Sequence, residues 1–242
     1  GTTGDAAVEK QAAAERARMH SLVTLLLKGV SWIGLVFLSF GVNYTPTLLL
    51  ILPGKKWATD EAASVLSWYC VYIMTLALNG TSEAFIYAVA TKKQVLWLTV
   101  AHSVCSVVFA LLCAPLMSIH GTSGIVMANC AVMLLRIVYA GSLIRSFFPG
   151  QSMRAAFPAP AVLAAFGAAF AVTRASEWHR LSTTAALVAE GGSGSAVWLI
   201  PATIHIGVGI VLLVLVLATV WVSELGAIRQ LAAVAADHKK SD

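Results

Sequence analysis

The chain has 242 residues, of which 59% are hydrophobic and only 11% are charged. Soluble domains carry roughly a quarter of charged residues, so this composition excludes an ordinary soluble domain and indicates an integral membrane protein. The net charge of +5 does not indicate nucleic-acid binding, because basic residues beside apolar spans are typical of cytoplasmic loops. The four cysteines all lie in apolar segments and are expected to be small buried hydrophobes.

Six stretches are long enough to cross a bilayer, which takes about 20 mostly apolar residues. They predict an all-α, polytopic membrane bundle over residues 21–225, with a polar segment on each side, 1–20 and 226–242. The expected spans are residues 21–42, 62–90, 95–117, 122–148, 158–175 and 196–225. Between the first two spans, YTPTLLLILPGKKW is too short to cross and is expected to turn at the interface, with Trp57 at headgroup level.

The distribution of Lys and Arg predicts the orientation of the bundle. Cytoplasmic loops carry an excess of these residues, and the excess falls on the side of the N-terminus. The opposite side holds only Lys55, Lys56, Arg174 and Arg180. Both termini are therefore expected in the cytoplasm. That side holds Lys10, Arg16, Arg18, Lys92, Lys93, Arg145, Arg154, Arg229, Lys239 and Lys240.

Ionisable residues inside a bilayer are costly and are read as functional candidates. Lys28, Glu83, His102 and Arg136 lie in four different spans. At 1.5 Å per residue, each is roughly 10–18 Å from the cytoplasmic end of its span. Mixed charge at one depth indicates a water-accessible cavity, in which Glu83 would pair with Lys28 or Arg136. His205 in the last span is a fifth and weaker candidate.

Polar neighbours extend this candidate site. Asn79, Ser82 and Glu83 fall on one face of the second predicted helix. Asn129 precedes Arg136 by two helical turns on the fourth, which places the two nearly in line. An arginine in a hydrated cavity suits a phosphate headgroup, because its planar fork holds phosphate through two hydrogen bonds.

Each of these candidates also has a purely structural interpretation. A buried pair of Glu83 and Arg136 would simply fix helix packing, Lys28 lies close enough to the interface to snorkel, and His102 would be a hydrogen-bonded packing histidine. The sequence contains no P-loop, G-x-S-x-G or H-E-x-x-H motif. We therefore expect no enzyme activity, no metal and no cofactor.

Two motifs resemble the C-terminal half of the Rft-type family. YCVYIMTLALNGTSEAF, residues 69–85, is similar to Y-C-x-Y followed by N-G-x-[TS]-E-x-F, and GIVMANCAVMLLRIVYA, residues 124–140, is similar to A-N-C-x-N-M-x-x-R-I. One departure is Val132, which stands where the family pattern has a second Asn. The similarity covers residues 25–148, and the last two spans resemble the family only in hydropathy and order.

The resemblance implies a branch of the multidrug/oligosaccharidyl-lipid/polysaccharide flippase superfamily, whose lipid-linked types have fourteen helices in two lobes around a cavity. The chain would then be the last six helices, without the N-terminal lobe. The implied function is translocation of dolichol-diphosphate-linked oligosaccharide across the endoplasmic-reticulum membrane for N-glycosylation, with that lipid, membrane lipid and the missing lobe as partners. The alternatives are a non-transporting binding or scaffold protein of the same pathway, and a related exporter of another lipid-linked sugar.

The resemblance also assigns roles within the candidate site. Arg136, with Lys28, would contact the diphosphate, and Glu83 would balance the cations. Hydrogen bonds to sugars or water would come from Asn79, Asn129, Ser82 and His102.

Overall fold

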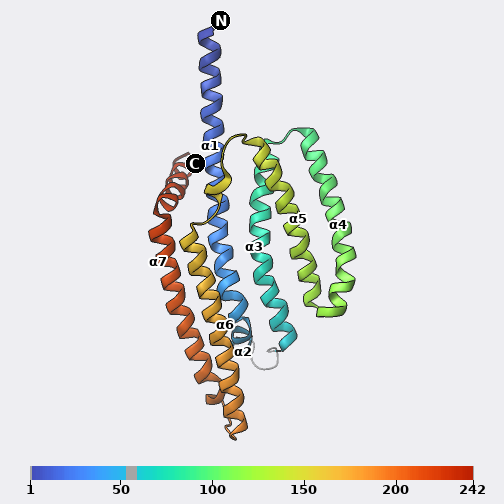
Figure 1. Cartoon of the computed structure of the whole chain (residues 1–242), viewed down its shortest axis with the longest axis vertical. Helices are drawn as coiled ribbons and strands as arrows, with labels where there is room; N and C mark the ends of the chain where they lie inside the picture. Colours follow the sequence, from blue (N-terminus) through green and yellow to red (C-terminus); the bar gives the residue numbers. More distant parts are fainter. Residues whose placement is uncertain (1, 53–58, 242) are drawn as a thin grey trace.

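In the computed structural model, the described residues are 2–52 and 59–241. Six helical segments run up and down beside one another (Figure 1), and each is long and apolar enough to cross a membrane. No strand occurs within those two ranges. The predicted all-α membrane bundle is confirmed.

The first segment joins three elements, α1 (Thr2–Val36), the π-helical turn η1 (Phe37–Gly41) and α2 (Val42–Ile51). It is followed by α3 (Asp60–Val89), α4 (Lys92–His120), α5 (Ser123–Phe147), the short 3-10 helix η2 (Met153–Ala156), α6 (Pro160–Ala189) and α7 (Ala196–Ser241). The joined first segment lies in the middle of the bundle. On one side α1 packs against α3, α3 against α5 and α5 against α4, and on the other side η1 and α2 contact α6, which packs against α7.

Local sequence signals begin and end these helices. Thr59 caps α3 by accepting a hydrogen bond of 3.2 Å from the backbone N–H of Ala62. A capping box begins α4, in which the Thr91 hydroxyl accepts from the Gln94 N–H at 3.4 Å and the Gln94 amide oxygen accepts from the Thr91 N–H at 2.9 Å. At its other end, Gly121 adopts φ +60°, which side-chain-bearing residues rarely do.

The first helical segment does not turn where the sequence predicts. It continues through Pro46 to Ile51, although proline has no N–H for the carbonyl of Val42 four residues earlier. The Ser67 hydroxyl of α3 donates to that carbonyl at 3.0 Å instead, so a tertiary contact satisfies the group. The expected interfacial position of Trp57 lies outside the described residues.

The fifth helix is also longer than predicted, because α6 runs on past residue 175 to Ala189. The predicted span ends at residue 175 and leaves Arg180 outside it, whereas Arg180 lies within α6. Arg180 is 5% exposed and donates to Glu177, which is 2% exposed, through bonds of 2.6 and 2.7 Å. Residues three apart on a helix are neighbours, so this charge pair is neutralised within the helix and does not end it.

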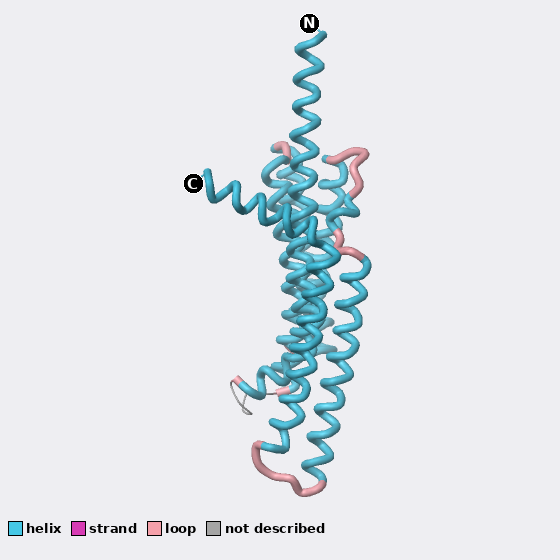
Figure 2. The backbone as a smooth tube through the Cα atoms, turned by 90° about the vertical axis from the view of Figure 1, so that its left-hand side faces the viewer, coloured by secondary structure: helices cyan, strands magenta, loops and turns pink. Residues whose placement is uncertain are grey.

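The two termini lie at the same end of the bundle (Figure 1). Residues 2–20, expected as a polar segment, are helical and form the first part of α1. The last helix extends past residue 225 to Ser241 and is kinked at Glu224, whose φ of −122° and ψ of 18° are not helical. Beyond this kink the chain leads away from the bundle (Figure 2).

The α4–α5 hairpin depends on a glycine that permits close approach. A Cβ atom on Gly124 would overlap the backbone of Leu116, whereas one on Gly80 of α3 would meet open space. We expect Gly124→Ala to lower the unfolding free energy by about 1–3 kcal/mol, as overpacking does. The matched control Gly80→Ala gains helix propensity of up to about 1 kcal/mol. Thermal unfolding of the detergent-purified protein, followed by circular dichroism, checks both, and equal midpoints for the two variants would contradict the assigned packing.

Candidate functional site

Three ionisable residues of the predicted set meet between α3, α4 and α5. Arg136 of α5 donates from Nε to Glu83 Oε1 and from Nη2 to Glu83 Oε2, with both bonds 2.9 Å long. This bidentate geometry is the strongest form of a guanidinium–carboxylate contact. His102 of α4 lies beside the pair, with its Nε2 2.9 Å from Glu83 Oε1. We call these three residues the midspan cluster.

The histidine is a close neighbour of the carboxylate and not a hydrogen-bond partner. Although the two atoms are near each other, His102 Nε2 has no hydrogen-bond partner among the described residues. A hydrogen bond needs alignment as well as distance. The midspan cluster therefore consists of one bidentate ion pair and an imidazole that lies beside the carboxylate without a hydrogen bond to it.

The ion pair is only partly buried. The side chains of Arg136 and Glu83 are 23% and 13% exposed. The pair occupies two of the five N–H donors of the guanidinium. It can therefore hold α3 to α5 and still offer donors to a further oxygen, such as one from phosphate or sugar.

Lys28 is not part of this cluster. Its Nζ lies 2.9 Å from Oε2 of Glu224 on α7, so the predicted choice between Lys28 and Arg136 as the partner of Glu83 is settled in favour of Arg136. The other oxygen of Glu224 accepts a 2.6 Å hydrogen bond from the backbone N–H of Ala159, at the start of α6. The kink at Glu224 thus lets one carboxylate join α1, α6 and α7.

We expect Glu224→Ala to lower the unfolding free energy by about 3 kcal/mol, because it removes one partner of a buried pair and leaves the other uncompensated. Glu224 is 5% exposed and Lys28 is 15% exposed. Chemical unfolding in detergent micelles measures the loss. In the double variant Glu224→Ala with Lys28→Met no charge is stranded, so it should recover part of the loss, and a double variant as unstable as Glu224→Ala would contradict the pairing.

The three remaining candidates are dispersed. Asn79 is 3% exposed, and its Oδ1 has no hydrogen-bond partner among the described residues. Ser82 is buried and donates to the Leu78 carbonyl of its own helix at 2.8 Å. Asn129 is half-buried on α5.

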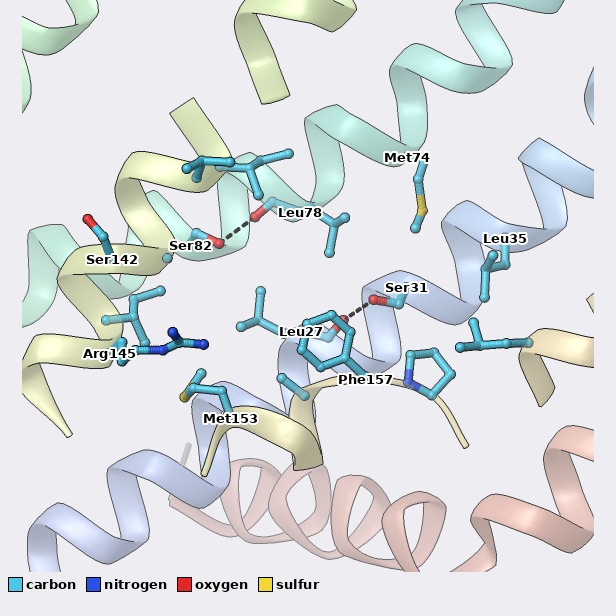
Figure 3. A pocket seen from close by; sticks show the side chains of 17 residues that line it. Leu27, Ser31, Leu35, Met74, Leu78, Ser82, Ser142, Arg145, Met153 and Phe157 are labelled. Atoms are coloured by element: carbon cyan, nitrogen blue, oxygen red, sulfur yellow. Dashed lines mark hydrogen bonds between the residues drawn. The ribbon is translucent and has the colours of Figure 1, made fainter. Parts of the chain in front are cut away.

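A cavity of about 690 Å³ lies on the other side of the α3–α5 pair, against α1 and the connection from α5 to α6. Of the seven candidate residues only Ser82 lines this cavity. Ser82 and Ile137 face the cavity, and their chain neighbours Glu83 and Arg136 face each other in the midspan cluster. Figure 3 shows this cavity together with Arg145, which the sequence predicts at the cytoplasmic end of the span 122–148.

The weaker candidate His205 belongs to a buried polar group between α2, α6 and α7, whose other members sequence reasoning missed. His205 is fully buried beside the ion pair of Glu177 and Arg180, with its Nε2 3.4 Å from Glu177 Oε2. Tyr44 stacks on the histidine ring at 4.0 Å and donates to the His205 carbonyl at 2.6 Å. The spacing of Glu177 and Arg180 by three residues was the available signal, and Tyr44 carried none. This cluster fastens the central helical segment to the last two helices.

The candidate site lies on segments that known proteins share. The model of the Rft protein family matches residues 5–233, which is most of the chain. The chain belongs to the Rft protein family. Glu83, His102 and Arg136 all fall inside the matched range.

Individual Rft relatives match about half of the chain. A protein of Drosophila melanogaster, named Man(5)GlcNAc(2)-PP-dolichol translocation protein RFT1, is 38% identical over 128 residues, which are 52% of this chain and 23% of the relative. Relatives of the same name are 34% identical over 122 residues in Schizosaccharomyces pombe (50% of this chain, 23% of the relative) and 32% identical over 142 residues in Mus musculus (58% and 26%). The matched part is thus about a quarter of the length of these Rft proteins. No solved structure matches the chain.

Proposed function

We propose that this chain is the last six helices of a protein that translocates dolichol-diphosphate-linked oligosaccharide from the cytoplasmic to the lumenal leaflet of the endoplasmic reticulum. The names of the relatives support the substrate class. The excess of Lys and Arg at the end of the bundle that holds both termini supports a cytoplasmic location for that end. The complete transporter would have fourteen helices in two lobes.

The observation that carries the proposal is the ion pair between Glu83 and Arg136 inside two membrane helices. A diphosphate crossing a hydrocarbon barrier needs groups that replace its hydration, and a preformed guanidinium does so through charge-assisted hydrogen bonds. Glu83 holds Arg136 in place and balances its positive charge when no substrate is bound. Arriving phosphate oxygens then take the unused donors, and they compete with the carboxylate for the others.

The remaining candidates have supporting roles in this proposal. His102 supplies a ring nitrogen beside the carboxylate. Asn79, whose Oδ1 has no hydrogen-bond partner among the described residues, offers an acceptor within α3. Ser82 and Asn129 extend the polar surface of α3 and α5. Lys28, held by Glu224, stabilises the junction of α1, α6 and α7 and need not touch the headgroup.

The test uses the full-length protein in cells that depend on it for N-glycosylation. Arg136→Gln and Glu83→Lys, at normal expression, are expected to lower N-glycan occupancy of reporter glycoproteins, whereas the control Gly80→Ala, on the same helix but facing open space, keeps it. If both variants keep wild-type N-glycan occupancy, the proposed role of the ion pair is contradicted.

A second candidate function is a non-transporting protein that binds the lipid-linked oligosaccharide and presents it to other proteins. The position of Arg136 favours it, because Arg136 does not line the cavity described above. Full-length protein in liposomes with a defined lipid-linked oligosaccharide separates the two. Protein-dependent movement between leaflets supports translocation, and binding without movement supports presentation. If the protein moves a different lipid-linked sugar between leaflets faster than the dolichol-linked oligosaccharide, it is a related exporter.

A further inference from the structure

The cavity described above has a mainly apolar lining. Its walls come from the apolar sides of α1, α3 and α5, and the connection from α5 to α6 covers one end (Figure 3). Along α1 it extends from Leu27 to Leu35, eight residues or about 12 Å at 1.5 Å per residue. The cavity is thus an elongated apolar space with one covered end.

Water is a poor occupant for this space. At about 30 Å³ per molecule the volume corresponds to many waters, and each needs two to four polar partners. The hydroxyls of Ser31 and Ser82 donate to carbonyls of their own helices, at 2.7 and 2.8 Å, so they offer little to water. An apolar ligand fits this lining better.

One charged side chain stands at the covered end. Arg145 lies in the last turn of α5, and Figure 3 shows its guanidinium directed into the cavity, near Met153. Among residues 8–52 and 59–230, whose side chains the structure describes, none forms a hydrogen bond or ion pair with the Arg145 side chain. Arg145 is exposed, and none of these described residues occupies a donor of its guanidinium, in contrast to Arg136.

We propose that this cavity binds a long-chain lipid phosphate, with the hydrocarbon chain between α1, α3 and α5 and the phosphate on Arg145. Apolar walls and a single cation at one end complement an amphiphile that carries its anion at one end. This inference rests on the proposed function and deepens it, because it gives the carrier lipid a binding site separate from the midspan cluster. Phosphate held at Arg145 would lie at the end of α5, about two and a half turns from Arg136.

The experiment labels the full-length protein in lipid nanodiscs with a photoreactive, sugar-free polyprenyl phosphate and locates the label by mass spectrometry. Label is expected on the stretches of α1 and α3 that line the cavity. Arg145→Gln should weaken binding about tenfold, as loss of a charge-assisted hydrogen bond does. Gly141→Phe should abolish labelling, because Gly141 lines the cavity and its Cβ position is open.

Two matched controls accompany these variants. Arg154→Gln removes an exposed charge from the same connection, and Gly167→Phe adds an equal ring at an open position of α6 outside the cavity. Both should label like the wild type. Unlabelled lipid phosphates should compete, whereas uncharged polyprenol should compete about tenfold more weakly and inorganic phosphate should not compete.

Three results would overturn the proposal. They are unchanged labelling in Gly141→Phe, equal affinity in Arg145→Gln and the wild type, and no label in the wild-type cavity because another segment of the longer protein fills it. Failure of the proposed function has a different signature. In that case labelling depends on Arg145, but N-glycan occupancy stays normal when the full-length protein is removed from cells.

Discussion

Replacing Arg180 by leucine is expected to lower the unfolding free energy by about 3–5 kcal/mol, the cost of removing one partner of a buried ion pair. The Glu177 carboxylate, 2% exposed, would lose both hydrogen bonds from the guanidinium. Its remaining polar neighbours are Thr47, at 3.5 Å, and His205, at 3.4 Å. Neither replaces two charge-assisted bonds, so α6 should loosen from α2 and α7.

Unfolding of the detergent-purified protein measures this effect, and a double-mutant cycle isolates the pair. Glu177→Leu with Arg180→Leu leaves no stranded charge, and replacing a buried pair by apolar residues is often neutral. The double variant should therefore be more stable than Arg180→Leu alone. Arg174→Leu, an exposed arginine on the same helix, is the control and should change little. Equal losses for Arg174 and Arg180 would show that the pair is not buried in the way described.

Exchanging the charges of the midspan cluster should abolish activity in the single variants and restore much of it in the double variant. Glu83→Arg puts two guanidinium groups side by side, and Arg136→Glu does the same with two carboxylates. Like charges at such distances cost several kcal/mol when water is partly excluded. With Glu83→Arg and Arg136→Glu together, a guanidinium and a carboxylate again form an ion pair between α3 and α5.

N-glycan occupancy and purified yield together distinguish packing from substrate contact. If the pair only fixes helix packing, the double exchange recovers both yield and occupancy. If Arg136 also contacts the diphosphate, as proposed, yield recovers while occupancy stays lower, because the guanidinium now projects from α3 instead of α5. Low yield in the double exchange would mean that the two side chains do not pair in the membrane.

Much of the bundle can be predicted from sequence because lipid imposes simple rules. Every backbone polar group in hydrocarbon must be bonded internally, so long apolar runs become helices. The same rules predict that the fifth span ends at residue 175, because the polar residues Glu177 and Arg180 follow, whereas α6 continues to Ala189. Their charges cancel on one face of the helix, and hydropathy, which scores residues singly, does not register a pair.

The candidate site was also only partly predictable from the sequence. Glu83 and Arg136 were recognisable as partners because each is an isolated charge in an apolar span, at a similar depth. Lys28 met the same criteria, yet its partner is Glu224, 196 residues away in the chain. The sequence predicts Arg145 at the cytoplasmic end of a span, and only the structure shows that it lines the cavity. Depth along a helix follows from residue number, but the neighbour that a helix face meets does not.

The sequence by itself determined that this is a six-helix membrane bundle of the Rft family, with a carboxylate and a guanidinium within its spans. Only the tertiary structure decided which charges pair, that the cavity and the midspan cluster lie on opposite sides of α3 and α5, and that Arg145 has no partner among the described residues. The physical reason is that hydropathy and helical period are local properties of the chain. Pairing and cavities arise where side chains from distant helices meet or fail to fill space.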